Sequence, residues 1–417
     1  MKLIIHRGTQ HIGGSCVELS TERTRIIFDI GQMLPSIEDG THVIKTEPPI
    51  IEGLYKDDKK SVDAIFVSHG HWDHIGLIEE VHPSIPIFIG EQALNIVNMT
   101  ARFTGGQSII NPANLLVSGK EIKMGDIWIT PYLVDHSGFD AYAFIIKADG
   151  KCIVYTGDFR DHGRKKLATN YFTSHIPKGI DALLVEGTMM SRLGERVETE
   201  NWIEDQAYHF MKRRNTPIFV VQSSTNIDRL VGMYKAAKKS GRIFVIDIFT
   251  AHILSQLGSS IPKPGQFHDI RVFYPFNLTK RMFNRRDGES LLKRFSHHLI
   301  SRKELGERND YCMIIRGSMH SDLQHIRNLQ NAGVIYSMWR GYKKDNQMKS
   351  LLKDMKQREM EIIDLHTSGH ASVKTIKSII QRSEPKKLIP IHTEKPGQFS
   401  EEYKDTYLAK DGEVIRI

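Results

Sequence analysis

Short apolar runs separated by turn residues dominate the first 190 residues. Such runs predict β-strands at Ile26–Asp29, Ala64–Val67, Ile87–Ile89, Ile127–Val134, Tyr142–Ile146, Cys152–Tyr155 and Ala182–Val185. The pair Asp149-Gly150 lies between two of these runs and is a strong hairpin signal. Few apolar positions recur at helical spacing, so we expect a β-rich sandwich with a few helices rather than a doubly wound sheet.

From about residue 191 the pattern changes to strands that alternate with longer amphipathic helices. Ile218–Val221 is a β-run, capping residues follow at 223–226, and apolar positions then recur at helical spacing from Ile227 until Gly241. Ile243–Ile248 is the next predicted strand, and Met313–Ile315 and Val334–Tyr336 are further candidates. This strand–helix–strand order predicts a parallel sheet in a second domain.

After about residue 360 the first pattern returns. We expect strands at Glu361–Leu365, Lys387–Ile391 and Glu413–Ile417, a helix over Val373–Arg382, and a turn at Asp411-Gly412. The 417 residues also exceed what one ordinary core holds. We therefore predict one domain formed by residues 1–190 and 361–417, with a second domain inserted over 191–360.

Composition excludes several classes of protein. No run of about 18 apolar residues is present, and the opening MKLIIHRGTQHIGG turns polar early, so we expect a soluble, cytoplasmic protein with no membrane partner. The cysteines Cys16, Cys152 and Cys312 form no CxxC pair, and we expect reduced thiols rather than a disulfide framework or a cysteine-type zinc site. Metal ligands must then come from the 20 histidines and the carboxylates.

The net charge of +8 is unevenly distributed. Residues 191–360 contain 30 Lys and Arg against 17 Asp and Glu, whereas the rest of the chain contains 27 against 32. Basic residues often do no more than solvate helices. An excess confined to one predicted domain also fits a polyanionic substrate that is attracted through its phosphates.

The segment AIFVSHGHWDHIGL carries the strongest chemical signal. A predicted buried strand ends at Ser68, four candidate ligands follow at once, and a helix is expected to begin with Ile75, Leu77 and Ile78. His69 and His71 can face one metal ion while Asp73 and His74 turn toward a second. Zinc prefers imidazole and carboxylate ligands, and two ions about 3.5–4 Å apart can activate one water.

Three later residues can complete two coordination shells. His136, Asp158 and His392 each follow a predicted strand directly. Taken singly, each is more often a structural residue, but beside an HxHxDH segment the ligand interpretation is favoured. We therefore predict that His69, His71, Asp73, His74, His136, Asp158 and His392 bind metal.

Several segments resemble the metallo-β-lactamase superfamily, and more narrowly its β-CASP branch of nucleic-acid nucleases, with ribonuclease J-like proteins the most similar. They are SHGHWDH, VDHSGFDAY, YTGDFR, VEGT at Val185–Thr188, TSGHAS at Thr367–Ser372 and PIHTE at Pro390–Glu394, with QSSTNIDRL, RGSM and YSMWRGY in the insert. The resemblance implies a four-layer αββα sandwich with an inserted β-CASP domain of mainly parallel sheet.

Carried over residue by residue, the resemblance implies a role for each position. His69, His71 and His136 are implied to bind one zinc ion, Asp73, His74 and His392 the other, and Asp158 both, with manganese as the alternative metal. It implies that Asp73, His370 and Glu186 are catalytic, with His370 near the scissile phosphate and Glu186 beside it. A histidine at position 392 is typical of the RNA-processing members.

Other positions are weaker candidates. Ser368, Gly369 and Ser372 either present hydrogen-bond donors to a phosphate or simply cap the helix from Val373. Arg340 is a candidate for substrate binding, and Trp339 and Tyr342 for stacking on nucleotides, although we interpret Trp339 as core. Ser223, Ser224 and Thr225 are candidate helix caps.

The expected function is a metal-dependent nuclease that hydrolyses phosphodiester bonds in single-stranded RNA, by exonucleolytic or endonucleolytic cleavage. A DNA nuclease, a small-ester or thioester hydrolase of the same fold, and a non-catalytic RNA-binding subunit are the alternatives. The basic insert is superfluous for a small ester, and a non-catalytic relative tends to lose metal ligands, whereas this chain has them all. Homo-oligomerisation is left open.

Overall fold

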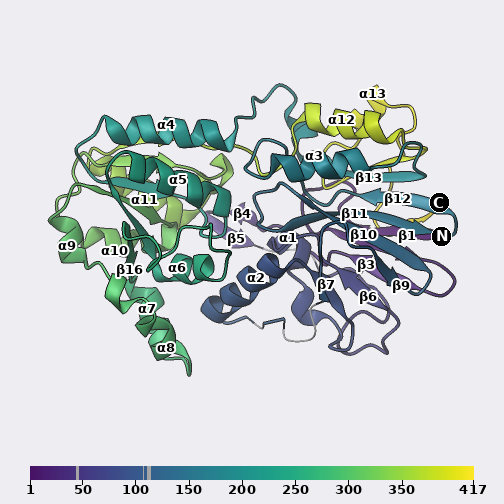
Figure 1. The fold of residues 1–417 in the computed structure, drawn as a ribbon, viewed down its shortest axis with the longest axis horizontal. Coiled ribbons are helices and arrows are strands. Elements are labelled where there is room, and N and C mark those ends of the chain that lie inside the picture. The colour runs from purple at the N-terminus through teal and green to yellow at the C-terminus, as the bar shows by residue number, and fades with distance from the viewer. Residues whose placement is uncertain (44–46, 107, 110–113) are drawn as a thin grey trace.

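Three large β-sheets organise the chain (Figure 1). The computed structural model describes residues 1–43, 47–106, 108–109 and 114–417. The first sheet runs in the order β21 (Val414–Arg416), β1 (Lys2–Arg7), β2 (Cys16–Ser20), β3 (Arg25–Phe28), β6 (Ala64–Phe66), β7 (Ile87–Ile89), β8 (Asn114–Leu115). The second runs in the order β20 (Leu388–Ile391), β13 (Ala182–Glu186), β12 (Lys151–Tyr155), β11 (Ala141–Ala148), β10 (Ile127–Val134), β9 (Ile122–Met124).

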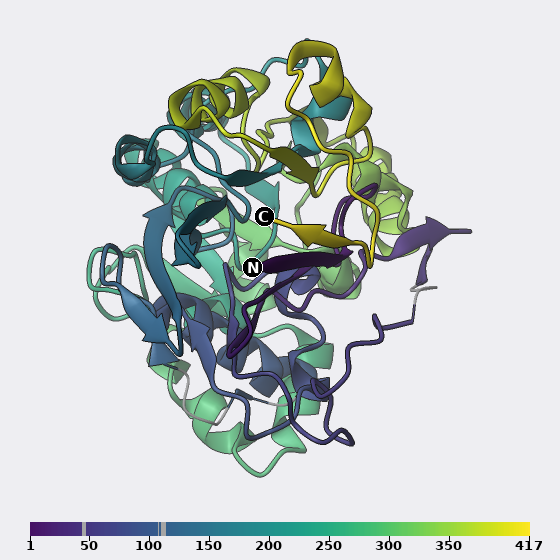
Figure 2. The ribbon, with the colours of Figure 1, turned by 90° about the vertical axis from the view of Figure 1, so that its right-hand side faces the viewer.

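These two sheets pack face to face around one apolar core. The ring of Phe28 from β3 lies 5.1 Å from the ring of Phe144 and 5.7 Å from that of Tyr155, both on the second sheet. Side chains on alternate positions point into this layer, as the period of a strand requires. The first and last strands of the chain, β1 and β21, pair antiparallel in the first sheet, so the two termini lie side by side (Figure 2).

Helices cover both outer faces of this sandwich. α3 (Lys166–His175), α12 (Val373–Ser383) and α13 (Gly397–Glu402) place Phe172, Ile376 and Phe399 against the second sheet. α1 (Trp72–Ile75) and the start of α2 (Glu91–Thr104) place Ile75 and Ala93 against the first. The predicted αββα layering is thus confirmed. The helix expected from Ile75 is wrong in position: α1 is one turn that ends there, so Asp73 and His74 lie on the helix itself.

The third sheet is parallel throughout. Its order is β16 (Ile270–Phe273), β15 (Ile243–Asp247), β17 (Tyr311–Ile315), β14 (Ile218–Val221), β18 (Gly333–Tyr336), β19 (Glu361–Asp364). Helices flank both faces: α4 (Glu200–Lys212), α5 (Ile227–Lys239), α6 (Ile248–Ser255), α7 (Phe276–Phe283) and α8 (Gly288–Lys293) on one, α9 (Arg302–Gly306), α10 (His320–Gln324) and α11 (Asn346–Gln357) on the other. We call this sheet with its helices the parallel lobe, and the other two sheets with theirs the sandwich.

The strand at 361–364 lies elsewhere than expected. We interpreted Glu361–Leu365 as the return to the sandwich, but β19 pairs in parallel with β18 at the edge of the third sheet. The chain therefore re-enters the sandwich only after this strand. The division of the chain at residues 190 and 360 otherwise stays a prediction.

Local signals explain why the predicted βαβ unit forms. The side chain of Asn226 accepts a hydrogen bond from the N–H of Arg229 and so caps α5, while Ser223 and Thr225 hydrogen-bond to each other in the preceding turn. Gly241 follows the helix with φ of +77°, a conformation that glycine adopts without strain. At the other predicted turn, Ala148 pairs with Lys151 across Asp149-Gly150, which confirms the hairpin.

Charged side chains buried between the sandwich and the parallel lobe join the two. Arg160 donates to Asp135 on the sandwich side and to Glu200 and Asp228 on the lobe side, at 2.8–3.1 Å. Arg229 donates two hydrogen bonds to Glu200, at 2.8 and 3.0 Å. Burial alone would raise the pKa of Glu200, but the two guanidinium groups outweigh it and lower this pKa to about 2. We call these five residues the interlobe charge network.

The structure also bears on two expectations that came from composition, the state of the cysteines and the presence of membrane-spanning helices. All three cysteines are free thiols; Cys16 and Cys312 are buried, whereas Cys152 is only partly so. Among the described residues, no helix has both the length and the apolar composition needed to cross a bilayer.

Candidate metal centre

The seven predicted ligands converge at one edge of the sandwich, where strands of both sheets end. β6 leads to His69, β10 to His136, β12 to Asp158 and β20 to His392. Each of these four side chains is 0–1% exposed. Residues more than 300 positions apart in sequence therefore meet in a buried site that rigid strands hold in place.

Three histidines form the first donor group. Ring nitrogens of His69, His71 and His136 lie within 4.8 Å of one another, and Nε2 of His136 lies 3.1 Å from Nδ1 of His71. Gly138 makes this approach possible, because a Cβ there would lie 2.7 Å from the ring of His69. The glycine two residues after His136 thus leaves the room that the imidazoles occupy.

The second donor group combines carboxylates and imidazoles. Donor atoms of Asp73, His74, Asp158 and His392 also lie within 4.8 Å of one another. Nε2 of His392 lies 3.2 Å from Oδ2 of Asp73, and Nε2 of His74 lies 3.2 Å from Oδ2 of Asp158. His392 adopts φ of +50°, so the backbone turns sharply where β20 delivers this side chain.

Asp158 connects the two groups. Its Oδ2 lies 4.0 Å from Nε2 of His69 and 3.9 Å from Nε2 of His136, in addition to its contact with His74. Ligand atoms that each lie about 2.1 Å from one zinc ion are at most about 4.2 Å apart. These distances place one carboxylate within reach of ions in both groups.

The donor atoms also have the chemistry that a cation requires. Nε2 of His69, Nε2 of His74 and both carboxylate oxygens of Asp158 are buried without a hydrogen-bond partner in the described part of the chain. Unsatisfied buried polar atoms are costly and need an explanation. A cation between them provides it, and a mixture of imidazole and carboxylate suits zinc.

The protonation states agree with this role. Burial and the neighbouring imidazoles lower the pKa of His69 and His136 well below the usual value, and burial lowers that of His71 to about 4. Burial opposes the charge of Asp158, but His392 and His74 outweigh it and hold its pKa well below the usual range. At neutral pH the first donor group therefore offers neutral imidazoles, and Asp158 is an ionised carboxylate. Burial opposes the charge of His74, but Asp158 and Asp29 raise its pKa well above the usual value, so metal binding there releases a proton.

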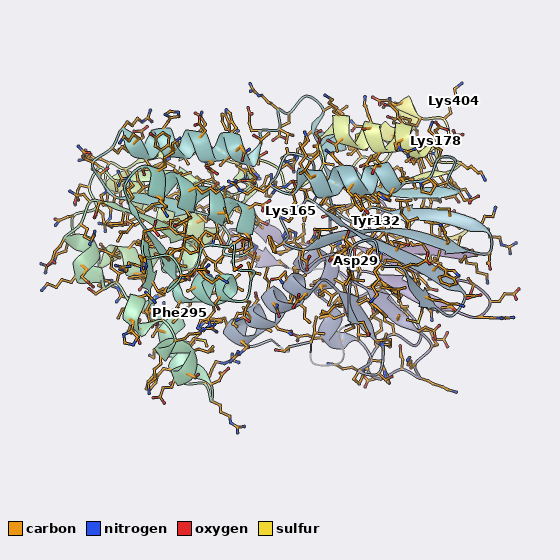
Figure 3. The ribbon with its side chains drawn as sticks, in the orientation of Figure 1. Asp29, Tyr132, Lys165, Lys178, Phe295 and Lys404 are labelled. Carbon is orange, nitrogen blue, oxygen red and sulfur yellow. The ribbon has the colours of Figure 1, made fainter. Side chains whose placement is uncertain are left out.

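Asp29, which we did not predict, orients His74. Its Oδ2 lies 2.8 Å from Nδ1 of His74 and accepts hydrogen bonds from the hydroxyls of Ser68 and Tyr155. Figure 3 labels Asp29 within the sandwich. A proton on Nδ1 shared with this carboxylate leaves Nε2 free to face Asp158. Asp29 ends the predicted strand Ile26–Asp29 just as the ligands end theirs, and this position is the signal that could have identified it.

Thr188, also not predicted, orients His392. Its Oγ1 lies 2.9 Å from Nδ1 of His392 and donates to the carbonyl of the same residue at 3.2 Å. The hydroxyl oxygen can thus accept a hydrogen bond from the N–H at Nδ1, which leaves Nε2 directed at Asp73. Nothing in the spacing of Thr188 indicated this contact.

Replacing Asp29 with asparagine is expected to weaken metal binding by about 10- to 100-fold, the effect typical of losing a partner that orients a ligand. The amide keeps the shape but removes the negative charge that fixes the proton of His74 on Nδ1. Competition with a chromogenic chelator measures the affinity. Asp39→Asn is the matched control, because Asp39 has the same left-handed backbone (φ +47°) on the exposed surface. Equal affinities in the two variants would show that Asp29 does not act on the ligand.

Glu186 and His370 lie beside the donor groups. Nδ1 of His370 lies 3.7 Å from Oε1 of Glu186 and 3.5 Å from Oδ2 of Asp158. Glu186 is fully buried and accepts hydrogen bonds from the N–H groups of Thr188 and Ala371, so it also fixes the loop that holds His370. Burial opposes the charge of His370, but Asp158 and Glu186 raise its pKa to about 9.

The other candidate residues differ in their contacts and in their exposure to solvent. Ser372 caps α12, since its side chain accepts from the N–H of Thr375, and Ser368 accepts from the N–H of His370. Gly369 lies against Ser137, where a Cβ would come within 2.4 Å of the Ser137 hydroxyl. The side chain of Arg340 is 81% exposed and lies 3.5 Å from Asp364.

Our interpretation of Trp339 as core is wrong. Trp339 is 46% exposed, and its ring meets Tyr342 edge-on at 5.6 Å, with the guanidinium of Arg192 5.7 Å from the ring centre. Burial and, to a lesser degree, the carboxylate of Asp73 raise the pKa of Tyr342. Tyr342 of the parallel lobe is therefore near enough to the metal centre for the charge of Asp73 to act on it.

Two family models match the chain. The model described as a beta-lactamase superfamily domain matches residues 45–212, and the model described as a Zn-dependent metallo-hydrolase RNA specificity domain matches residues 346–404. Together they cover the segments that carry the seven donors. A crystal structure of a protein of unknown function from Enterococcus faecalis has the same fold, with a TM-score of 0.81, 22% identity and 99% of each chain covered.

Named relatives agree with these models. Ribonuclease J of Helicobacter pylori is 22% identical over 98% of this chain, and Ribonuclease J of Mycoplasma genitalium is 22% identical over 94%. Ribonuclease J 2 of Streptococcus pyogenes is 25% identical over 59%. The chain spans 60%, 68% and 45% of the lengths of these three proteins, respectively.

The αββα sandwich, with a buried histidine and aspartate cluster where its strands end, is the architecture of the metallo-β-lactamase superfamily. Family and cluster together assign a metal cofactor to the protein. Within the superfamily, the RNA specificity domain model and the relatives named ribonuclease J agree with the resemblance to the β-CASP branch. By these two family models and these relatives, the chain is a metallo-β-lactamase-fold protein that is ribonuclease J-like.

Proposed function

We propose that this protein is a zinc-dependent nuclease that hydrolyses phosphodiester bonds in single-stranded RNA with two metal ions. The observation that carries the proposal is the pair of donor groups joined by Asp158. The RNA specificity domain model over residues 346–404 and the names of the relatives favour RNA over DNA. The excess of 30 basic over 17 acidic residues in 191–360 fits a polyanion better than a small ester.

Each donor group is proposed to hold one ion. His69, His71 and His136 hold the first, Asp73, His74 and His392 the second, and Asp158 both; the 3.1–4.0 Å separations among these donors support this division. The chemistry that two bound zinc ions would supply is Lewis acidity, which would lower the pKa of a bound water toward neutral and offset charge on phosphate oxygens. Side chains and backbone groups of the protein carry out proton transfer and substrate positioning.

His370 is the proposed proton donor or stabiliser of charge on the phosphate, as a positioned histidine commonly is. Glu186 is the group that orients it, through the 3.7 Å approach to Nδ1 and the hydrogen bond to the N–H of Ala371. The loop of Ser368, Gly369 and Ser372 is proposed to hold the adjacent phosphate with its remaining backbone donors. Arg340, with its exposed guanidinium, is the proposed contact for the next one.

The decisive experiment incubates the protein, reconstituted with zinc or manganese, with end-labelled RNA that carries a 5′-monophosphate. DNA of the same sequence and a small thioester are the parallel substrates. We expect RNA cleavage that requires metal, with binding that weakens as salt rises because phosphate contacts release counterions. Product lengths distinguish cleavage from an end from internal cleavage.

Other outcomes identify the alternatives. Equal cleavage of DNA would make the chain a general nuclease, and hydrolysis of the thioester alone would make it a small-molecule hydrolase. RNA binding without cleavage by the metal-loaded protein would indicate a non-catalytic subunit.

A further inference from the structure

A short helical hairpin carries an unusual concentration of positive charge. Helices α7 and α8 project from the lower edge of the parallel lobe, away from α1 and its metal ligands (Figure 1). Residues 276–294 contain six basic side chains against two acidic ones. The basic residues are Lys280, Arg281, Arg285, Arg286, Lys293 and Arg294. We call residues 276–294 the basic hairpin.

The two carboxylates of the basic hairpin leave most of its charge unpaired. Asp287 contacts Arg102 of α2 at 2.7 Å and Arg285 at 3.8 Å, and Glu289 contacts Lys293 at 2.6 Å. The remaining four, Lys280, Arg281, Arg286 and Arg294, are exposed and form no ion pair with a described residue. Free cations so close together repel one another, and an anion that binds them relieves this repulsion.

Two phenylalanines on the same hairpin face solvent. Phe276 is 61% exposed and Phe283 is 71% exposed, whereas Leu278 and Met282 of the same helix are buried. Positions 276, 280 and 283 share one face of a helix, so Lys280 lies between the two rings. Phe295, labelled in Figure 3, is buried at the base of the hairpin and anchors it to the lobe core. The exposed rings are therefore held on a fixed support.

A groove beside α8 extends this surface to the sandwich. It has a volume of about 760 Å³ and is lined by cations from both parts of the molecule, Arg102 from α2 and Arg286, Lys293 and Arg294 from the hairpin. Glu289 is its one acidic lining residue, and it is paired with Lys293. The groove is thus an open, mainly positively charged surface between the sandwich and the parallel lobe.

We propose that the basic hairpin and this groove form a second binding site for single-stranded RNA, separate from the metal centre. Bases stack on Phe276 and Phe283, while phosphates bind Arg281, Arg286 and Arg294, the combination that sequence-independent binders of single strands use. A second copy that docked through the same hairpin would bring like charges together, whereas the phosphates of a nucleic acid complement the charge. The identity of that nucleic acid as RNA rests on the proposed function; the site itself rests on charge and exposure.

Such a site is expected to increase the affinity for long RNA without changing the rate of the cleavage step. A long substrate gains affinity from contacts at the hairpin in addition to those at the centre, whereas a very short one has nothing to place there. We therefore expect the hairpin to lower KM for long RNA and to leave kcat unchanged.

The test compares two charge-reversed variants by the binding of fluorescein-labelled oligo(U) of 40 nucleotides, using metal-loaded protein that carries His370→Ala in every arm so that cleavage is slow. Arg281→Glu/Arg286→Glu alters the hairpin. Lys235→Glu/Lys303→Glu is the control, since both lysines are exposed on the same lobe and the charge changes equally. We expect Kd to rise at least about 10-fold for the hairpin variant and less than about 2-fold for the control, with the salt slope reduced by about 1–2.

A third variant, Phe276→Ala/Phe283→Ala, keeps the charge and removes the rings. Since both rings are exposed, folding is expected to be intact, which circular dichroism verifies. We expect at least about a 5-fold rise in Kd, the lower end of the contribution of base stacking. Cleavage of a four-nucleotide RNA by the same variants with His370 intact is expected to match that of the parent.

Several outcomes would overturn the inference. They are unchanged RNA binding by the hairpin variants, equal weakening in the control variant, and displacement of RNA by polyglutamate of matched charge as readily as by unlabelled RNA. Absence of RNA cleavage by the parent protein, with the hairpin effects intact, would instead refute the proposed function and leave the hairpin as a site for RNA.

Discussion

Replacing Asp158 with asparagine is expected to reduce kcat/KM for RNA by at least about 10³-fold and to lower the metal content below that of the parent protein. Oδ2 of Asp158 lies 3.2 Å from Nε2 of His74 and about 4 Å from donors of the other group, so one carboxylate serves both. An amide has the same size but no charge, and loss of several kcal/mol of charge stabilisation corresponds to this factor. Elemental analysis and end-labelled RNA cleavage measure the two effects.

Asp161→Asn provides the control for this change on the same loop. Asp161 accepts a hydrogen bond from the hydroxyl of Thr375 and belongs to neither donor group. We expect its variant to keep the metal and the activity of the parent. If Asp158→Asn retained full metal content and cleavage, the assignment of Asp158 as the shared ligand would be wrong.

Replacing His370 with alanine is expected to lower kcat by about 10²- to 10⁴-fold while the metal content stays the same, the effect of losing a general acid. His370 lies next to Asp158 and Glu186 but is partly exposed, with 21% of its side chain accessible, whereas the other donors near it are buried. It therefore sits where substrate can reach it. Single-turnover cleavage, with metal analysis of the same sample, measures both quantities.

The exposed His366, four residues upstream, is the control, and His366→Ala is expected to cleave RNA normally. Loss of metal from His370→Ala would make this residue a ligand instead. An unchanged kcat would remove it from the reaction altogether.

Much of the architecture could be predicted because each strand signal was local. β10 and β14 have the predicted bounds, and β7 does as well. The HxHxDH segment located the site, and the position of His136, Asp158 and His392 at strand ends predicted that they would meet it. The structure brings all seven together, and metal binding by each of them stays a prediction.

The rest depended on tertiary contacts that spacing does not encode. Asp29 and Thr188 act on ligands that are 45 and 204 residues away in sequence. The sheet to which β19 belongs depends on the strand it pairs with, and the apolar pattern of a single strand does not specify that partner. Trp339 is exposed because Arg192 and Tyr342, rather than a core, surround its ring.

The interlobe charge network has a consequence for how this protein can be divided. Arg160 has partners on both sides, so excising residues 191–360 and rejoining the chain would remove the carboxylates of Glu200 and Asp228 and leave Asp135 as its remaining carboxylate partner in this network. Removing one partner of a buried ion pair costs about 3–5 kcal/mol, a large part of a typical folding free energy. Neither piece is therefore expected to fold as an independent unit, and truncated fragments should be recovered as insoluble or unfolded material.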